Sequence, residues 1–210
     1  VYPMVTDNYN LWSYTNDING PNWVRSNFTA SANTTTAPDG TTTADTLIEN
    51  TANGNHYIAN QSGAIALSSS NCTMSIYVKK IARDWFCISL FDGTTSRNAW
   101  FNINTGTIGT VQSGAIANIS NAGNGWYRCS ITMPMSASNV NYTAYYGADA
   151  DNSISYTGNG LATYYVWGAQ LEIGNLSTYQ PILTTPSAFM ASQMKYNLKD
   201  ARDLDAAFRL

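Results

Sequence analysis

Residues 85–92 read Trp-Phe-Cys-Ile-Ser-Leu-Phe-Asp, and residues 98–104 read Asn-Ala-Trp-Phe-Asn-Ile-Asn. Apolar residues occupy every second position in both runs: Phe86, Ile88 and Leu90 in the first, and Ala99, Phe101 and Ile103 in the second. Because successive side chains of a strand point to opposite faces, this alternation predicts two strands that each turn one face to a core. The Asp-Gly pair at 92–93 is typical of a turn.

Strand-like runs recur along most of the chain. The clearest strands are predicted at Cys72–Lys80, Trp85–Asp92, Asn98–Asn104, Gly125–Pro134, Tyr142–Ala148 and Ala162–Ile173. Shorter strands are predicted to begin at Trp23 and to cover Ala44–Glu49, and Pro38 suits the first central position of a turn at 37–41. Short strands with no helix between them predict an all-β fold, an antiparallel β-sandwich or jelly roll, and not βαβ units.

The sequence divides into three parts of different character. Residues 1–8 form an N-terminal segment, and residues 9–183 hold the predicted sandwich, with an edge strand at Tyr9–Tyr14 and Trp12 in the core. In residues 184–210 the apolar spacing is close to a helical period and charges gather, which predicts a connector or short helical arm. The chain lacks an initiator methionine and ends without a helix stop signal, so we expect a piece of a longer protein.

Composition restricts the class of partner. Charged residues make up 11% of the 210 residues, and the net charge is −3. The basic cluster Lys79, Lys80 and Arg83 is too small to hold a phosphate backbone, so nucleic acid is not an expected partner. No run of eighteen apolar residues occurs and the first residues lack the pattern of a signal peptide, so membrane insertion is not expected.

Residues able to carry catalysis are scarce. His56 is the single histidine, and a lone histidine is more often structural than catalytic. No phosphate-binding Gly-Lys-Ser/Thr ending occurs, although a glycosidase pair of carboxylates from distant strands stays open. Cys72, Cys87 and Cys129 lack metal-ligand spacing and are predicted to be small buried hydrophobic residues. We therefore expect a protein that is not an enzyme and needs no cofactor.

One loop offers a candidate calcium site. Residues 147–153 read Gly-Ala-Asp-Ala-Asp-Asn-Ser, and alternate Asp and Asn oxygens suit a hard cation such as Ca²⁺. The glycine and closing glutamate of an EF-hand loop are missing. Two interpretations stay open: a solvated loop, which is favoured, and a calcium site at Asp149 and Asp151.

The polar faces of the strands suggest a glycan site. Its candidate residues are Trp85, Asn98, Trp100, Asn102 and Arg128. Aromatic rings flanked by amides and arginine suit sugars, because the C–H faces of a sugar stack on the rings while its hydroxyl groups take directional hydrogen bonds. The competing interpretation, which is somewhat favoured, is that the tryptophans fill a second hydrophobic layer or a subunit interface.

Four motifs in order add a family resemblance. They are Asn-Leu-Trp-Ser at 10–13, Ala-Pro-Asp-Gly-Thr at 37–41 with Ala-Asp at 44–45, Gly-Trp-Tyr-Arg-Cys at 125–129, and Val-Trp-Gly-Ala-Gln-Leu-Glu at 166–172. Together they resemble a β-sandwich module of bacteriophage virion proteins of the tail-fibre and head-fibre type, similar to jelly-roll carbohydrate-binding modules. The resemblance covers roughly residues 9–183 and implies that Trp126 and Trp167 define the fold before they bind any ligand.

The resemblance also implies a location and a role. It implies a structural module of the virion that serves surface display and host attachment, binds host or environmental glycans, and contacts other virion subunits, with a homo-oligomer expected. The alternative is a decoration or assembly domain that binds other virion subunits without recognising glycans. Exposure of Trp85 and Trp100 would favour glycan binding, whereas their burial between chains would favour assembly.

Overall fold

The computed structural model describes residues 10–61, 71–92, 94–135 and 143–182. Fourteen strands lie within these ranges, and the two larger sheets have six strands each. The first sheet contains, in spatial order, β1 (Trp23–Ser26), β5 (Tyr57–Asn60), β12 (Ala144–Ala148), β7 (Trp85–Phe91), β8 (Ser96–Asn102) and β9 (Thr107–Val111). The second contains β10 (Ile116–Gly123), β11 (Trp126–Pro134), β6 (Asn71–Lys80), β14 (Ala162–Ile173), β3 (Ala44–Glu49) and β2 (Phe28–Thr35).

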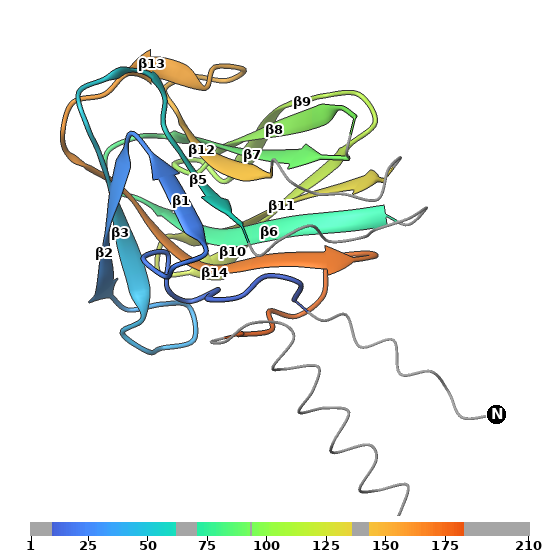
Figure 1. Cartoon of the computed structure of the whole chain (residues 1–210), viewed down its shortest axis with the longest axis horizontal. Coiled ribbons are helices and arrows are strands. Elements are labelled where there is room, and N and C mark those ends of the chain that lie inside the picture. The colour runs from blue at the N-terminus through green and yellow to red at the C-terminus, as the bar shows by residue number, and fades with distance from the viewer. Residues whose placement is uncertain (1–9, 62–70, 93, 136–142, 183–210) are drawn as a thin grey trace, which may run out of the picture.

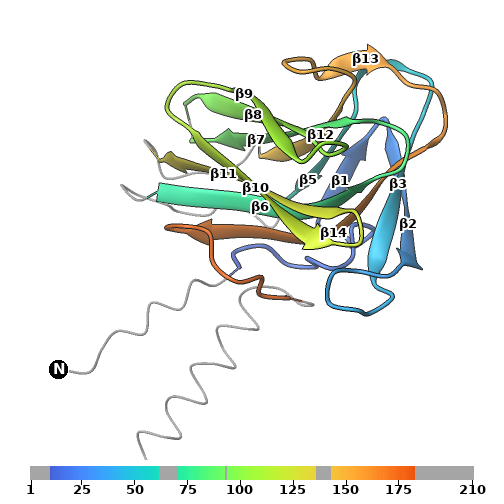
Figure 2. The same cartoon turned by 180° about the vertical axis from the view of Figure 1, so that it is seen from behind.

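The two sheets lie face to face, as Figures 1 and 2 show from opposite sides. Every strand pair in them is antiparallel. A small third sheet joins β13 (Ser155–Thr157) to β4 (Asn53–Asn55) at one end. The described part of the chain is therefore all-β, and the arrangement is consistent with the predicted antiparallel β-sandwich. The predicted arm at 184–210 and the segment 1–8 lie outside the described residues.

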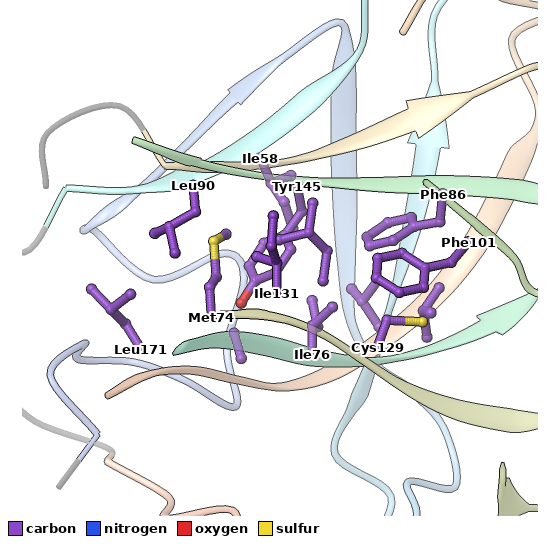
Figure 3. Close-up of a cluster of buried hydrophobic side chains, with 14 of the residues drawn as sticks. Ile58, Met74, Ile76, Phe86, Leu90, Phe101, Cys129, Ile131, Tyr145 and Leu171 are labelled. Atoms are coloured by element: carbon purple, nitrogen blue, oxygen red, sulfur yellow. The ribbon is translucent and has the colours of Figure 1, made fainter. Parts of the chain in front are cut away.

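The core fills the space between the sheets (Figure 3). Alternate residues of β7 and β8 point into it, so that Phe86, Ile88, Leu90, Ala99 and Phe101 are fully buried. The opposite wall comes from the second sheet, where Met74, Ile76, Cys129, Ile131 and Leu171 are also fully buried. The alternation in residues 85–92 and 98–104 thus indicated the correct faces. Trp12 is buried as predicted, edge-on to Trp23 and Tyr145.

The predicted edge strand at Tyr9–Tyr14 is wrong for its described part. Residues 10–14 form no strand, and besides one backbone hydrogen bond from Leu11 to Leu171 the Asn10 side chain joins this stretch to β14. Its Oδ1 accepts hydrogen bonds from the Leu171 and Trp12 amides at 3.1 and 3.2 Å, and its Nδ2 donates to the Ala169 carbonyl at 2.9 Å.

No helix in the described residues is long and apolar enough to cross a membrane.

A buried carboxylate on β3 ties two segments to the second sheet. Asp45 is 1% exposed, and its oxygens accept hydrogen bonds from the Ile18 amide at 2.8 Å and the Asn33 amide at 2.9 Å. Burial raises the pKa of Asp45 to about 6 in spite of both hydrogen bonds. The folded state therefore binds a proton at Asp45 more tightly than the unfolded state does. The fold is less stable against unfolding when Asp45 is ionised than when it is protonated.

Asp45 is expected to make the fold more stable as pH falls from 7 to 4. Because its folded pKa is raised from 3.8 to about 6, the gain develops between these two values and approaches about 3 kcal/mol. The check is urea unfolding of the wild type and Asp45→Asn across this range, since the variant retains every other titrating group. A stability difference between the two proteins that does not change with pH would contradict the assignment.

Candidate functional site

The outer face of the second sheet carries a row of large side chains across three strands. Tyr77 of β6 is the register partner of Arg128 on β11 and of Trp167 on β14. All three point outward because the alternate positions of their strands are taken by core residues. The rings of Tyr77 and Trp167 are in contact, with centroids 5.3 Å apart and an interplanar angle of 60°.

A β-bulge in β14 sets the direction of Trp167. Between Trp167 and Gln170 the strand has one residue more than β6 opposite it. Gly168 takes up the extra length with a φ of +64°, and a Cβ there would lie 3.0 Å from the Tyr77 ring. The Trp-Gly-Ala-Gln sequence thus turns Trp167 and Gln170 to the same outer face, while Ala169 stays in the core.

Tyr179 completes an aromatic group with Trp167 and Tyr77. Its ring lies 4.6 Å from that of Trp167 and 6.3 Å from that of Tyr77, at interplanar angles of 60° and 78°. The Tyr179 hydroxyl is hydrogen-bonded to Thr15 and donates to Asn16. Burial is the main cause that raises the pKa of Tyr179, so the hydroxyl keeps its proton at neutral pH.

Polar contacts hold the segment that carries Tyr179 against the sheet. The Arg128 guanidinium donates to the Ser177 carbonyl at 2.6 Å and to the Ser75 hydroxyl at 3.1 Å. The buried Glu172 carboxylate accepts from the Ser177 amide at 3.0 and 3.1 Å, and Gln170 accepts from the Gln180 amide at 2.8 Å. The position of Tyr179 is therefore set by side chains of β11 and β14.

These elements line an open pocket of about 370 Å³, which we call the aromatic pocket. It is lined by Asn16, Pro38, Asp39, Tyr77, Trp167, Thr178, Tyr179 and Pro181. Pro38 and Asp39 belong to the predicted turn, which the hydrogen bond from the Gly40 amide to the Ala37 carbonyl confirms. The Trp167 indole also donates to the Thr43 hydroxyl at 3.0 Å, just beyond this turn.

The pocket combines apolar ring faces with a few polar groups. Asp39 supplies a carboxylate, Asn16 an amide, and Tyr179 and Thr178 hydroxyl groups. A concave, mostly apolar site with a few fixed polar groups is the usual form of a small-ligand site. Aromatic faces suit the C–H faces of a sugar, and the polar groups suit its hydroxyls.

The five glycan-site residues predicted from the sequence lie on two opposite faces. Trp85 of β7 and Asn98, Trp100 and Asn102 of β8 are on the outer face of the first sheet. Arg128 is on the outer face of the second. Because the core separates these faces, the five residues do not form one site. Arg128 alone is near the aromatic pocket, with its Cζ 5.3 Å from the centre of the Tyr77 ring that lines it.

Trp100 does not project among exposed amides, and this expectation is corrected. It is 2% exposed, because residues 149–154 lie over it and its indole donates to the Ser153 carbonyl at 3.2 Å. Cys87 and Ala148 complete the buried group, and Ile154 packs against it. Trp100 thus fills a second hydrophobic layer, which was the favoured interpretation of the sequence pattern.

Two of the other predicted residues of this face, Trp85 and Asn102, have structural contacts. Trp85 is half-buried and packs on the backbone of β9, where a Cβ on Gly109 would lie 2.5 Å from its ring. The Asn102 side chain accepts from the amides of Asn104 and Thr105 at 3.1 and 3.0 Å and so holds the turn after β8. The Asn98 amide oxygen is buried, with no hydrogen-bond partner among the described residues.

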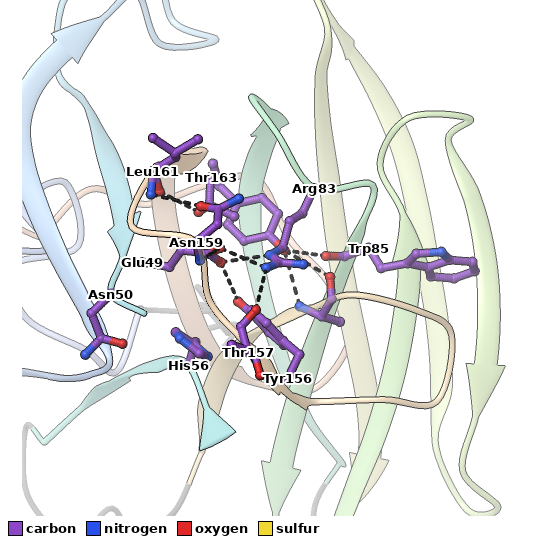
Figure 4. A network of polar contacts seen from close by, with 12 residues as sticks. Glu49, Asn50, His56, Arg83, Trp85, Tyr156, Thr157, Asn159, Leu161 and Thr163 are labelled. Atoms are coloured by element: carbon purple, nitrogen blue, oxygen red, sulfur yellow. Dashed lines mark hydrogen bonds and ion pairs between the residues drawn. The ribbon is translucent and has the colours of Figure 1, made fainter. Parts of the chain in front are cut away.

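His56 belongs to a buried polar network at the end of the sandwich (Figure 4). Its ring is fully buried and stacks on Tyr156, with centroids 4.3 Å apart and an interplanar angle of 13°. Its Nδ1 lies 3.1 Å from the Gly54 carbonyl, and no described residue forms a hydrogen bond to its Nε2. The described residues therefore provide no nucleophile bonded to His56.

Glu49 and Arg83 form the centre of the same network. Arg83 donates two hydrogen bonds of 2.8 Å to the Glu49 carboxylate, and its Cζ lies 3.9 Å above the Tyr156 ring. The Tyr156 hydroxyl and the Asn159 amide donate to the same carboxylate at 3.0 and 2.9 Å. Burial acts to raise the pKa of Glu49, but the hydrogen bonds from Arg83, Asn159 and Tyr156 outweigh it and lower the pKa.

The candidate calcium residues are in the loop that covers Trp100. Asp149 and Asp151 are both exposed, and the Asp151 oxygens accept from the Thr110 amide at 2.8 Å and the Thr110 hydroxyl at 3.0 Å. Within the described ranges, no three His, Cys, Asp or Glu side chains gather as a metal-ligand set. The contacts of Asp151 with β9 help to hold the loop in place.

The three cysteines are buried and unpaired, as predicted from the sequence. Burial raises the pKa of the Cys72 thiol to about 12 and that of Cys129 well above its usual value. Neutral thiols of this kind pack as small hydrophobic side chains.

In comparisons with known proteins, no protein-family model and no curated protein sequence matches the chain.

Proposed function

We propose that the chain is a non-catalytic carbohydrate-binding module and that the aromatic pocket holds the glycan. The observation that carries the proposal is the meeting of Tyr77, Trp167 and Tyr179 around a pocket of about 370 Å³ whose lining also includes a carboxylate and an amide. A volume of this size is within the range of small-ligand sites and accommodates one or two sugar units. The site differs from the one predicted on β7 and β8.

The aromatic side chains of the pocket are preorganised by contacts within the protein. Trp167 is set by the bulge at Gly168 and by its bond to Thr43, and Tyr179 is set by Thr15 and Asn16. Rings held in this way lose little conformational entropy when a sugar stacks on them. This supports recognition by stacking, with hydrogen bonds at the rim giving specificity.

The wider role rests on the motif resemblance. We propose that the module is part of a bacteriophage virion, with a jelly-roll-like fold that displays the pocket for host attachment. If each copy of the module binds host or environmental glycans weakly, several copies in a homo-oligomer would bind them with a higher overall affinity through multivalency. The Trp-Gly-Ala-Gln-Leu-Glu motif that contributes to the resemblance is the bulged strand that holds Trp167 in the pocket.

A second candidate function has its own observation. On the outer face of the first sheet, Tyr57 and Tyr146 are half-buried register partners with ring centroids 5.3 Å apart, and Trp85 is half-buried on the same face. Aromatic side chains of this kind are enriched at protein interfaces. This face suits a decoration or assembly domain that binds other virion subunits without glycan recognition.

Tyr77→Ala is expected to weaken glycan retention roughly tenfold, because it removes one stacking face of the pocket. The measurement is binding of the purified protein to a glycan array, followed by titration of the retained glycans. Tyr57→Ala is the matched control, since it removes a half-buried tyrosine from the opposite outer face. We expect wild-type retention for the control.

Equal glycan retention by wild type, Tyr77→Ala and Tyr57→Ala would contradict the pocket assignment. Release of cleaved sugar from any retained glycan would contradict the non-catalytic part of the proposal. If the array retains nothing and Tyr57→Ala abolishes binding to virion subunits, the assembly function is the correct one.

A further inference from the structure

The charged residue among those that line the aromatic pocket is an acid. Asp39 is the charged residue of the lining, and its side chain is exposed at the rim. Its Oδ1 accepts from the amide and hydroxyl of Thr41 at 2.9 and 2.7 Å, and no described residue forms a hydrogen bond to its Oδ2. The pocket therefore presents a carboxylate oxygen that is open to a ligand.

The nearby guanidinium does not neutralise this carboxylate. Arg128 is 9% exposed, and its terminal nitrogens donate to the Ser177 carbonyl and the Ser75 hydroxyl. It lies against Tyr77 and bonds to the segment that carries Tyr179, but it is not part of the lining. An acidic sugar would thus meet a carboxylate at the rim without a cation in the lining to bind its own charge.

Trp167 and Tyr179 favour the opposite charge, whereas the Tyr77 ring already has the Arg128 guanidinium 5.3 Å from its centre. Tyr77, Trp167 and Tyr179 meet at interplanar angles of 60° to 78°, so their faces point in different directions. The face of an aromatic ring is negative and attracts an ammonium group, with tryptophan giving the strongest attraction. The net charge of −3 adds a weak long-range attraction for cations.

We propose that the aromatic pocket selects glycan units that carry a free ammonium group, such as glucosamine, over their N-acetylated counterparts. This rests on the proposed glycan-binding function of the same pocket. The sugar ring stacks on an aromatic face, and the ammonium group lies between the ring faces and the Asp39 carboxylate. N-acetylation removes the positive charge and adds bulk, so the same sugar loses both electrostatic attractions.

The test is calorimetric titration of the protein with a glucosamine hexamer and with an N-acetylglucosamine hexamer at pH 6 and low salt. We expect the glucosamine hexamer to bind roughly fivefold more tightly, a difference set by one cation–π contact and one exposed ion pair. High salt should reduce the preference because it screens the exposed ion pair.

Asp39→Asn isolates the role of the carboxylate. The amide oxygen of the substituted side chain can still accept from the Thr41 amide, so the turn is retained while the charge is lost. We expect the ratio of the two affinities to fall toward one in the variant, because only the glucosamine hexamer loses an ion pair. Asp149→Asn is the matched control, because it removes an exposed carboxylate from the loop over the first sheet; it should leave the preference unchanged.

The outcomes separate this inference from the proposed function. If the N-acetylated hexamer binds as tightly or more tightly, and binding still depends on Tyr77, the ammonium preference is overturned and the glycan pocket stands. The same holds if the array retains only neutral or acidic glycans in a Tyr77-dependent manner. If no glycan binds at all, the proposed function fails, and the preference fails with it.

Discussion

Arg83→Met is expected to destabilise the protein by about 3 to 5 kcal/mol, the usual cost of leaving one partner of a buried ion pair alone. The Glu49 side chain has no exposed surface, whereas Arg83 is 17% exposed. Removal of Arg83 takes away its two hydrogen bonds to Glu49 and the cation above Tyr156, and leaves a buried carboxylate with only the Tyr156 and Asn159 donors. Urea unfolding at pH 7 measures the loss.

Two further variants test whether the loss of stability in Arg83→Met comes from the unpaired buried charge. Lys80→Met breaks the exposed pair with Asp84, whose side chains are 34% and 45% exposed, and should cost less than about 1 kcal/mol. The double variant Glu49→Gln with Arg83→Met should recover part of the loss, because no buried charge is left unpaired. A double variant less stable than Arg83→Met would contradict the explanation.

The pH dependence of the Arg83→Met effect has a defined sign. In the wild type the Glu49 pKa is lowered, so the pair contributes fully above the ordinary value of 4.5 and its contribution is lost as pH falls through the folded pKa. Without Arg83, burial should raise the Glu49 pKa, so acid relieves the buried charge. The stability difference between wild type and Arg83→Met should therefore shrink from pH 7 to pH 4.

Trp100→Ala is also expected to cost about 3 to 5 kcal/mol, because it opens a cavity beneath residues 149–154 and removes a hydrogen bond to Ser153. Trp85→Ala should cost less, since Trp85 is already half-buried at the surface. Urea unfolding of both variants gives the two values. At temperatures where both variants stay folded, glycan retention should be unchanged. If Trp100→Ala stays folded but loses glycan binding, the result would contradict the pocket assignment and would indicate a binding site on the first sheet.

The strands that were predictable are those with one buried and one polar face. Alternation gave the faces of β7, β8 and β11, whereas β6 and β14 were predicted as strand-like runs; the inner residues of all five strands belong to the core. No pattern in the sequence indicated β2, β9 or β10, which are all edge strands and carry mostly exposed or half-exposed residues. A strand with little buried apolar surface has a weak period of two, so its pairing is decided by its neighbours.

The candidate site was only partly predictable for a related reason. The Pro-Asp-Gly turn and the Trp-Gly-Ala-Gln strand were singled out as fold-defining, and the structure places both at the pocket. Tyr179 was not singled out, because it comes from an irregular segment and contacts Tyr77, which is far away in sequence. The burial of Trp100 could not be read from β8 alone, because its cover, at Ser153, is 53 residues away along the chain. Alternation gives the face of a residue but not what lies on that face.

The described chain enters and leaves the sandwich at neighbouring points on the second sheet. Thr15 and Ile182 exchange hydrogen bonds of 3.1 and 3.0 Å, and Asn10 donates to the Gln180 carbonyl at 3.1 Å. A pulling force applied through residues 10 and 182 would therefore load these few bonds first and would reach the strands of the core only after they part. The force would therefore pass between the two ends of the described chain through these bonds, and the core strands would not carry it while the bonds remain intact.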